Sequence, residues 1–172
     1  MEIRAGSRED ATAIEAVHFA SRDEVYRARI PDWSAYGPQR PARVERWEEW
    51  LTNPGITSLV GEVDGEIVGF VTVRGCADEG EDPTVVAEMP TLYVHPGRWR
   101  RGYGRALCAA ALDRARERGY TELTLWVVDL NVEAHGFYKA YGFVEDGATT
   151  VDEGASQEIS VTARRYRISL EE

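Results

Sequence analysis

A short stretch rich in glycine and arginine offers the first chemistry in this chain. The segment Trp99–Leu107, WRRGYGRAL, places Gly102 and Gly104 two residues apart. Three arginines surround the two glycines: Arg100, Arg101 and Arg105. Glycines let a backbone approach an anion closely, and the start of a helix has unpaired N–H groups with about half a positive charge. The stretch therefore indicates a phosphate or pyrophosphate cradle. A glycine-rich turn with solvated arginines is the alternative, and this stretch alone does not separate the two.

The elements on either side of this turn must position it. An apolar run, Thr91–Val94, ends a predicted strand over Val85–Val94. A helical stripe begins at Gly104, with apolar residues at offsets 0, 3, 4, 7, 8 and 11, and Gly119 is a natural end for this helix. The turn is therefore predicted to join a strand to the N-terminus of a helix.

Two well-known anion loops do not fit. The chain holds no G-x-x-x-x-G-K-[ST] string, which a Walker loop requires. A dinucleotide fingerprint needs a third glycine and a parallel βαβ unit near the start of the fold, and both are missing here.

The turn instead resembles the acetyl-CoA loop of the GNAT N-acetyltransferase superfamily, Q/R-x-x-G-x-G/A. Trp99 stands at the Q/R position, which removes one polar side chain from the usual pattern. A second segment, Asn131–Phe143, resembles the N-x-x-A-x-x-F-Y-x-x-x-G-F helix of the same family. Without the resemblance, that segment predicts a core helix with an aromatic stripe, for which Asn131 is the N-cap. The two motifs occur in the family's order, separated by a predicted strand, Leu123–Val128.

The resemblance implies an α/β (α+β) fold in a single N-acetyltransferase domain over residues 1–172. We expect a mixed, mostly antiparallel sheet of six to seven strands, splayed around the cofactor and flanked by about four helices. Pro90 supports the splay independently, because a proline inside a non-edge strand marks a bulge. A hairpin at Asp64-Gly65 is also predicted, since that dipeptide lies between two apolar runs.

The resemblance also implies acetyl-CoA as cosubstrate, with the pantetheine arm held like an added strand and the pyrophosphate on the turn. The residues expected to bind it are Leu92, Tyr93, Val94, Arg100, Arg101, Gly102, Tyr103, Gly104, Arg105, Asn131 and Tyr138.

Acetyl transfer to an amine requires a base, because an alkyl amine with a pKa near 10.4 is only roughly one part in two thousand neutral at pH 7. Glu88 occupies the strand position where many relatives place that base, and an arginine-paired strand carboxylate is the alternative. Tyr138 matches the tyrosine that protonates the leaving thiolate in the family, with aromatic packing as the alternative. A phenol with a pKa near 10 remains protonated at neutral pH.

Composition limits the remaining possibilities. A net charge of −10 argues against a nucleic-acid partner, and the apolar runs are too short to cross a bilayer. No cationic and apolar leader is visible at the start of the sequence. Cys76 and Cys108 lack metal-ligand spacing, which favours free thiols in a cytoplasmic protein without a metal. A homodimer remains open.

The acceptor is expected to be a small-molecule or peptide amine. Trp33 and Tyr36, in a proline-rich loop, are candidate contacts together with Glu88, and the acidic loop Asp78–Asp82 suggests a cationic acceptor. His18 lies on an apolar helical stripe and is predicted to be a half-buried core residue rather than a catalytic one. Transfer from another acyl-CoA, an oxygen acceptor, and a non-catalytic acyl-CoA sensor remain as alternatives.

Overall fold

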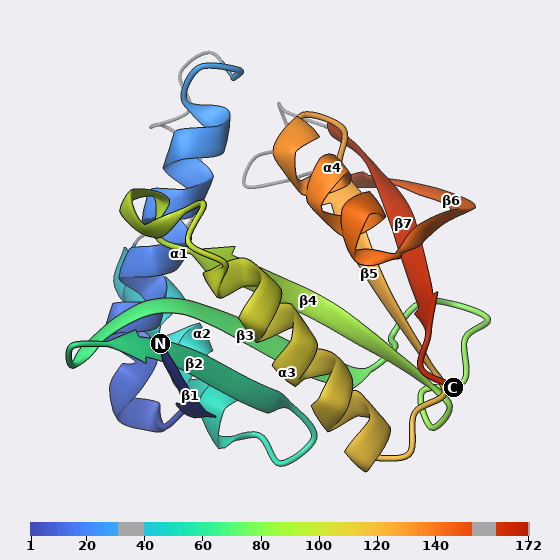
Figure 1. Cartoon of the computed structure of the whole chain (residues 1–172), viewed down its shortest axis with the longest axis horizontal. Helices are drawn as coiled ribbons and strands as arrows, with labels where there is room; N and C mark the ends of the chain where they lie inside the picture. The colour runs from blue at the N-terminus through green and yellow to red at the C-terminus, as the bar shows by residue number, and fades with distance from the viewer. Residues whose placement is uncertain (31–39, 153–160, 172) are drawn as a thin grey trace.

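The computed structural model describes residues 1–30, 40–152 and 161–171. Within these ranges, seven strands form one sheet in the order β1-β2-β3-β4-β5-β7-β6. In the same ranges, four α-helices cover this sheet (Figure 1). Neighbouring strands run antiparallel except β4 and β5, which are parallel. The mostly antiparallel mixed sheet predicted from the sequence is confirmed.

The two strands predicted over Val85–Val94 and Leu123–Val128 lie within one residue of their predicted positions. The strands are β1 Glu2–Ala5, β2 Thr57–Val63, β3 Glu66–Gly75, β4 Val86–Val94, β5 Glu122–Val128, β6 Val144–Asp152 and β7 Val161–Ser169. The α-helices are α1 Ala11–Tyr26, α2 Arg40–Thr52, α3 Tyr103–Glu117 and α4 Val132–Tyr141. Two short 3-10 helices, η1 Arg8–Asp10 and η3 Pro96–Arg98, precede α1 and α3.

Helices cover both faces of the sheet. On one face, α3 and α4 bury a core cluster that contains Leu107, Leu112 and Tyr138. On the other face, α1 and α2 bury a smaller cluster that contains Ile14 and Trp47. The central strands are therefore buried on both sides, which explains why they are continuous apolar runs rather than alternating ones.

The residues of β3 show this two-sided burial directly. Val71 and Val73 belong to the cluster beneath α3, whereas Phe70 belongs to the cluster beneath α1 and α2. Because successive side chains point to opposite faces, Arg74 continues the Phe70 face. The predicted hairpin before β3 is confirmed, with positive φ at Asp64 (52°) and Gly65 (80°).

The sheet opens between β4 and β5. These two strands pair only over Val86–Glu88, which lies opposite Glu122–Thr124, and they then separate along their length (Figure 1). The register between β3 and β4 shifts between Thr72 and Arg74, so two residues of β4, Met89 and Pro90, lie opposite one residue of β3. This β-bulge is the one that Pro90 predicted, and it turns β4 away from β5.

Gly69 allows the edge of this opening to form. It pairs with Val94 at the end of β4, and a Cβ atom at Gly69 would lie 2.8 Å from the Tyr93 carbonyl oxygen and 2.8 Å from Leu107 Cδ1. We expect Gly69→Ala to lower the free energy of unfolding by about 1–3 kcal/mol, as overpacking does. Urea denaturation measures this loss.

Gly136→Ala is the matched control, because Gly136 lies inside α4 and a Cβ atom there meets nothing within 4 Å. This variant should gain up to about 1 kcal/mol from helix propensity. Equal stability of the Gly69→Ala protein and the unaltered one would show that β4 and α3 can move apart without loss.

Candidate functional site

The end of β4 presents backbone groups to the opening. The His95 N–H donates to the Val68 carbonyl at 2.8 Å, so the backbone groups of residues 93 and 95 face β3. Alternation then places those of Leu92 and Val94 towards the opening. Tyr93, predicted together with them as a backbone contact, instead has its N–H and carbonyl on the β3 side.

A cavity of 850 Å³ occupies this opening. Its walls come from both faces of the sheet, with α1 and α2 on one side and α4 on the other, between β4 and the strands β5, β6 and β7. The lining residues from the helices and β4 are His18, Arg22, Tyr26, Arg43, Arg46, Trp47, Trp50, Met89, Pro90, Thr91, Leu92, Tyr93, Asn131, Ala134 and Tyr138. A ligand on one side of the sheet can therefore reach a ligand on the other side through the opening.

Tyr138 lines the cavity from α4. Its side chain is largely buried, with 8% of the residue exposed, and its ring packs edge-on against Phe137 and Phe143. Burial raises the pKa of Tyr138 far above its ordinary value, and the neighbouring Cys108 and Tyr93 add to this shift. The hydroxyl therefore remains a proton donor throughout the physiological pH range.

The position of Asn131 is compatible with both roles considered for it, the N-cap of α4 and a contact with the cofactor. Its side chain caps α4, since Oδ1 accepts a hydrogen bond from the Ala134 N–H at 3.1 Å, as the sequence predicted. Asn131 and Ala134 also line the cavity.

The glycine-arginine turn has the backbone of an anion site. Arg100 (φ 61°) and Gly102 (φ 80°) both adopt left-handed conformations, and Gly102 is the N-cap of α3 without a side-chain cap. The first amides of α3 are thus left to an external partner. Trp99 supplies a polar group in place of the usual Q/R side chain, because its Nε1 donates to the Val94 carbonyl at 2.6 Å.

The side chains of the turn fall into two groups. Arg100 and Arg101 are exposed. Arg105 lies over the ring of Tyr141 at 5.2 Å, and Tyr103 packs against the core cluster beneath α3. Residues 100–105 are not among those that line the cavity, so any cation they offer lies beyond its end.

Glu88 lies on the α1 and α2 face, directly opposite Arg74 on β3. The two side chains form an ion pair, and Glu88 is 7% exposed. The Arg74 guanidinium also stacks over Trp50 at 5.3 Å, and Trp50 lines the cavity. Glu88 itself does not line the cavity. Its present contacts are those of the alternative role, a strand carboxylate paired with an arginine.

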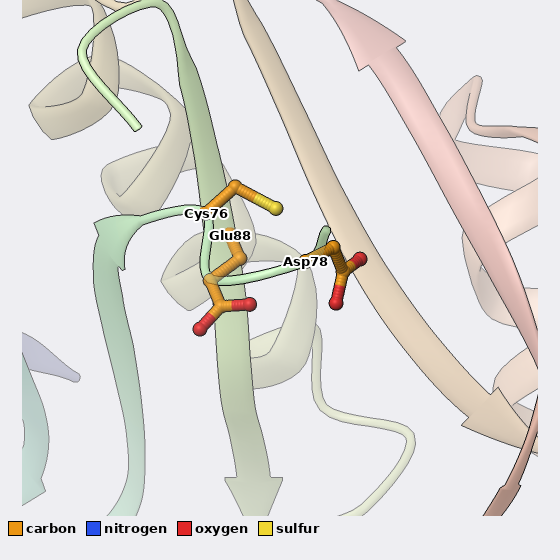
Figure 2. Close-up of side chains that lie close together, drawn as sticks. All are labelled: Cys76, Asp78 and Glu88. Carbon is orange, nitrogen blue, oxygen red and sulfur yellow. The ribbon is translucent and has the colours of Figure 1, made fainter. Parts of the chain in front are cut away.

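Glu88, Cys76 and Asp78 bring one thiol and two carboxylates within 4.8 Å of one another (Figure 2). Each group has another partner, because Arg74 pairs with Glu88, and Asp78 accepts a hydrogen bond from Trp126 Nε1 at 3.0 Å. Burial raises the pKa of the Cys76 thiol, which disfavours the thiolate that a metal would need. We therefore assign no metal to this cluster.

None of the residues of the acidic loop after β3 lines the cavity. Arg165 on β7 lies 3.0 Å from Asp78 and 3.0 Å from Glu81, and Arg167 also pairs with Glu81. These carboxylates are thus neutralised within the protein. The expected recruitment of a cationic acceptor by this loop finds no support in its geometry.

The sequence analysis did not predict that α1 and α2 form a wall of the cavity. Glu15 is fully buried and joins the two helices, with Arg43 Nε at 2.6 Å and Trp47 Nε1 at 2.9 Å. Burial would raise the pKa of Glu15, but nearby His18, Trp47 and Arg43 outweigh it and lower the pKa below its ordinary value. Glu15 therefore remains a carboxylate. A glutamate in a helical apolar stripe was the available signal.

His18 lines the cavity between Trp47 and Tyr93, with its Nδ1 3.5 Å from Glu15 Oε2. Burial lowers the pKa of His18, and the nearby arginines Arg22 and Arg43 add to this. The imidazole is therefore neutral at pH 7. Its burial agrees with the predicted core role, and its position on the cavity wall was not predicted.

Trp33 and Tyr36, the other predicted acceptor contacts, lie outside the described residues.

The sequence matches the family model of the acetyltransferase (GNAT) family over residues 22–143. It is 34% identical to a mycothiol acetyltransferase of Sanguibacter keddieii over 151 residues, which are 88% of this chain and 44% of that protein. It is also 32% identical to an uncharacterized N-acetyltransferase of Archaeoglobus fulgidus over 80% of this chain and 89% of that protein. The chain thus spans less than half the length of the mycothiol acetyltransferase that it matches.

Solved structures share the fold. A putative acetyltransferase from Salmonella typhimurium, in a structure with its cofactor acetyl-CoA, superposes with a TM-score of 0.73 at 22% identity, covering 100% of this chain and 95% of that one. An N-acetyltransferase from Thermoplasma acidophilum in complex with coenzyme A gives 0.70 at 21% identity, covering 95% and 96%. In the described ranges, no helix combines the length and the apolar character needed to span a membrane.

Gly104 allows a clean test of the turn. A Cβ atom at this position would lie 3.7 Å from the nearest atom outside its own helix, which belongs to Phe137, so a side chain fits the free protein. We expect Gly104→Asp to weaken CoA binding at least about 10-fold more than Gly104→Asn, because like charges near a protein surface repel by roughly 1–4 kcal/mol. Calorimetric titration with CoA measures both affinities, and equal losses would remove the pyrophosphate from this turn.

Proposed function

This chain belongs to the GNAT family of acetyltransferases, and we propose that it transfers an acetyl group from acetyl-CoA to a primary amine of a small molecule or peptide. The observation that carries the proposal is the cavity between β4 and β5. Its lining joins the α4 side of the sheet, where Tyr138 lies, to the α1 and α2 side through the opening. Two substrates that enter from opposite faces can meet there.

The residues present fit acetyl-CoA. The N–H and carbonyl of Leu92 and the N–H of Val94 face the opening. The extended pantetheine arm, which contains amides, can form hydrogen bonds with them as a neighbouring strand would. The Val94 carbonyl already accepts hydrogen bonds from Ser21 Oγ at 2.9 Å and from Trp99. These two bonds fix the end of β4 against α1 and against the turn, whose amides are left for the pyrophosphate. Acetyl-CoA supplies the acetyl thioester.

Tyr138 is the proposed acid. In the reaction, the amine nitrogen forms a bond to the acetyl carbon, the carbon–sulfur bond breaks, and the sulfur needs a proton. Burial keeps the pKa of Tyr138 high, so its hydroxyl stays protonated and can donate a hydrogen bond to the departing thiolate. This hydrogen bond stabilises the negative charge on sulfur until proton transfer completes the release of the thiol.

Glu88 is the proposed base, and the amine proton must reach it past Trp50 and Arg74. The ion pair with Arg74 accounts for the present position of the Glu88 carboxylate. A water molecule can carry the proton over the remaining distance, in keeping with general base catalysis through one water. The alternative role is structural, in which Glu88 only neutralises Arg74 beneath α2.

The Tyr138→Phe variant tests the activity and the acid together. The protein should release thiol from acetyl-CoA only when an amine is present, and the variant should bind CoA normally while kcat falls roughly 10–10³-fold, the range for general acid catalysis. Because the tyrosine pKa is raised, the unaltered protein should not lose this contribution up to about pH 10. Thiol release with an amine panel is the measurement. CoA binding without release for any amine would leave a sensor.

A pair of variants tests the base. Glu88→Gln keeps the shape of the side chain and removes its charge, and it should lower kcat/KM roughly 10²–10⁴-fold. Arg74→Gln breaks the same ion pair but keeps the carboxylate, and it should retain most of the activity. If both variants lose activity equally, the ion pair is structural and the base is another group.

A further inference from the structure

Helix α2 presents a cationic and aromatic face to the cavity. Four of its residues line the cavity at positions i, i+3, i+4 and i+7, which lie on one side of a helix: Arg43, Arg46, Trp47 and Trp50. Arg22 on α1 lines the same cavity. The indole rings offer apolar contact area, and the guanidinium groups offer positive charge.

The charge of this wall is not balanced by carboxylates within the cavity. Among the described residues that line it, three are arginines and none is an aspartate or glutamate. Arg43 is already held by Glu15, behind the wall, at 2.6 Å. Arg46 is exposed and forms no ion pair with any described residue. A ligand can therefore bind Arg46 without breaking an ion pair to another described residue, whereas binding Arg43 would compete with Glu15.

The phosphates of CoA are not the natural partner for Arg46. The turn proposed to hold them begins α3, which covers the opposite face of the sheet from α2 (Figure 1). The arm between the pyrophosphate and the thioester carries no charge. An anion at Arg46 must therefore come with the other substrate.

We propose that the acceptor carries an anionic group, such as a carboxylate, in addition to its amine, and that Arg46 binds this group. The inference rests on the proposed acetyl transfer and narrows its substrate class to amines that are also acids. A guanidinium matches a carboxylate through two parallel hydrogen bonds, which Lys would not reproduce. Trp47 and Trp50 beside Arg46 favour an apolar or aromatic body in the same molecule.

Matched pairs of acceptors measure the preference. Each pair consists of an acid and its amide with the same amine: phenylalanine and phenylalaninamide, tryptophan and tryptophanamide, and glycyl-phenylalanine and its C-terminal amide. Amidation lowers the pKa of the amine and leaves more of it neutral, so chemistry alone favours the amide. We expect the opposite order, with kcat/KM for the acid about 10- to 100-fold higher, as for a hydrogen bond to a charged group.

Three variants then assign the preference to one side chain. Arg46→Gln should bring the acid-to-amide ratio of kcat/KM close to 1, and Arg46→Lys should restore part of it. Arg114→Gln on the exposed side of α3 removes one arginine of equal charge far from this wall and should leave the ratio unchanged. The ratio compares two acceptors on one protein, so partial unfolding of a variant does not move it.

The outcomes separate this inference from the proposed function. If acetyl-CoA is turned over with amides at least as well as with acids, or if Arg46→Gln keeps the preference, the inference is overturned and acetyl transfer stands. If no acceptor of the panel is acetylated, the preference is measured by binding instead. The thermal stabilisation of the CoA-saturated protein by each acid is then compared with that by its amide. Equal or better stabilisation by the amides overturns the inference. Failure to bind CoA would instead remove the proposed function.

Discussion

The architecture of the site depends on the early end of the hydrogen-bonded pairing between β4 and β5. The two strands pair over three residues each and then separate, so the backbone groups of Leu92 and Val94 face a cavity rather than a neighbouring strand. Unpaired backbone groups inside a protein are costly, and this opening is tolerated because other groups occupy part of it. Ser21 and the Trp99 indole both donate to the Val94 carbonyl. The same two contacts fix α1 and the turn to the end of β4.

The opening also explains why one sheet can serve two substrates. A closed sheet with helices on both faces would separate α2 from α4 by a continuous layer of backbone. The bulge at Met89 and Pro90 redirects β4 without breaking its pairing with β3, so the core beneath α3 remains intact while the two faces communicate. Tyr138 can then lie on the α4 side and still reach the cavity that α2 lines.

Local sequence signals predicted the parts of the site that local backbone geometry determines. Gly102 needs a positive φ, Pro90 removes a ladder donor, and Asn131 caps a helix, and each of these effects acts within a few residues. The sequence could not place Trp99 Nε1 on the Val94 carbonyl, although the two residues are only five positions apart. That contact depends on the path of η3 between them.

Local signals could not predict side-chain partners that come from distant segments of the chain. These partners change the predicted charge around the site from negative to positive. A run of acids at 78–82 in a chain of net charge −10 suggested a negative approach to the thioester. Arg165, about 85 residues further along, neutralises Asp78 and Glu81 because β7 pairs with β5. Meanwhile α2 turns arginines towards the cavity. The local potential is set by which charges the fold brings together. An acidic protein can therefore build a cationic pocket, and a surface of like charge would not attract an anionic acceptor from a distance. Selection of such an acceptor would then act after encounter, through bidentate contact within the cavity.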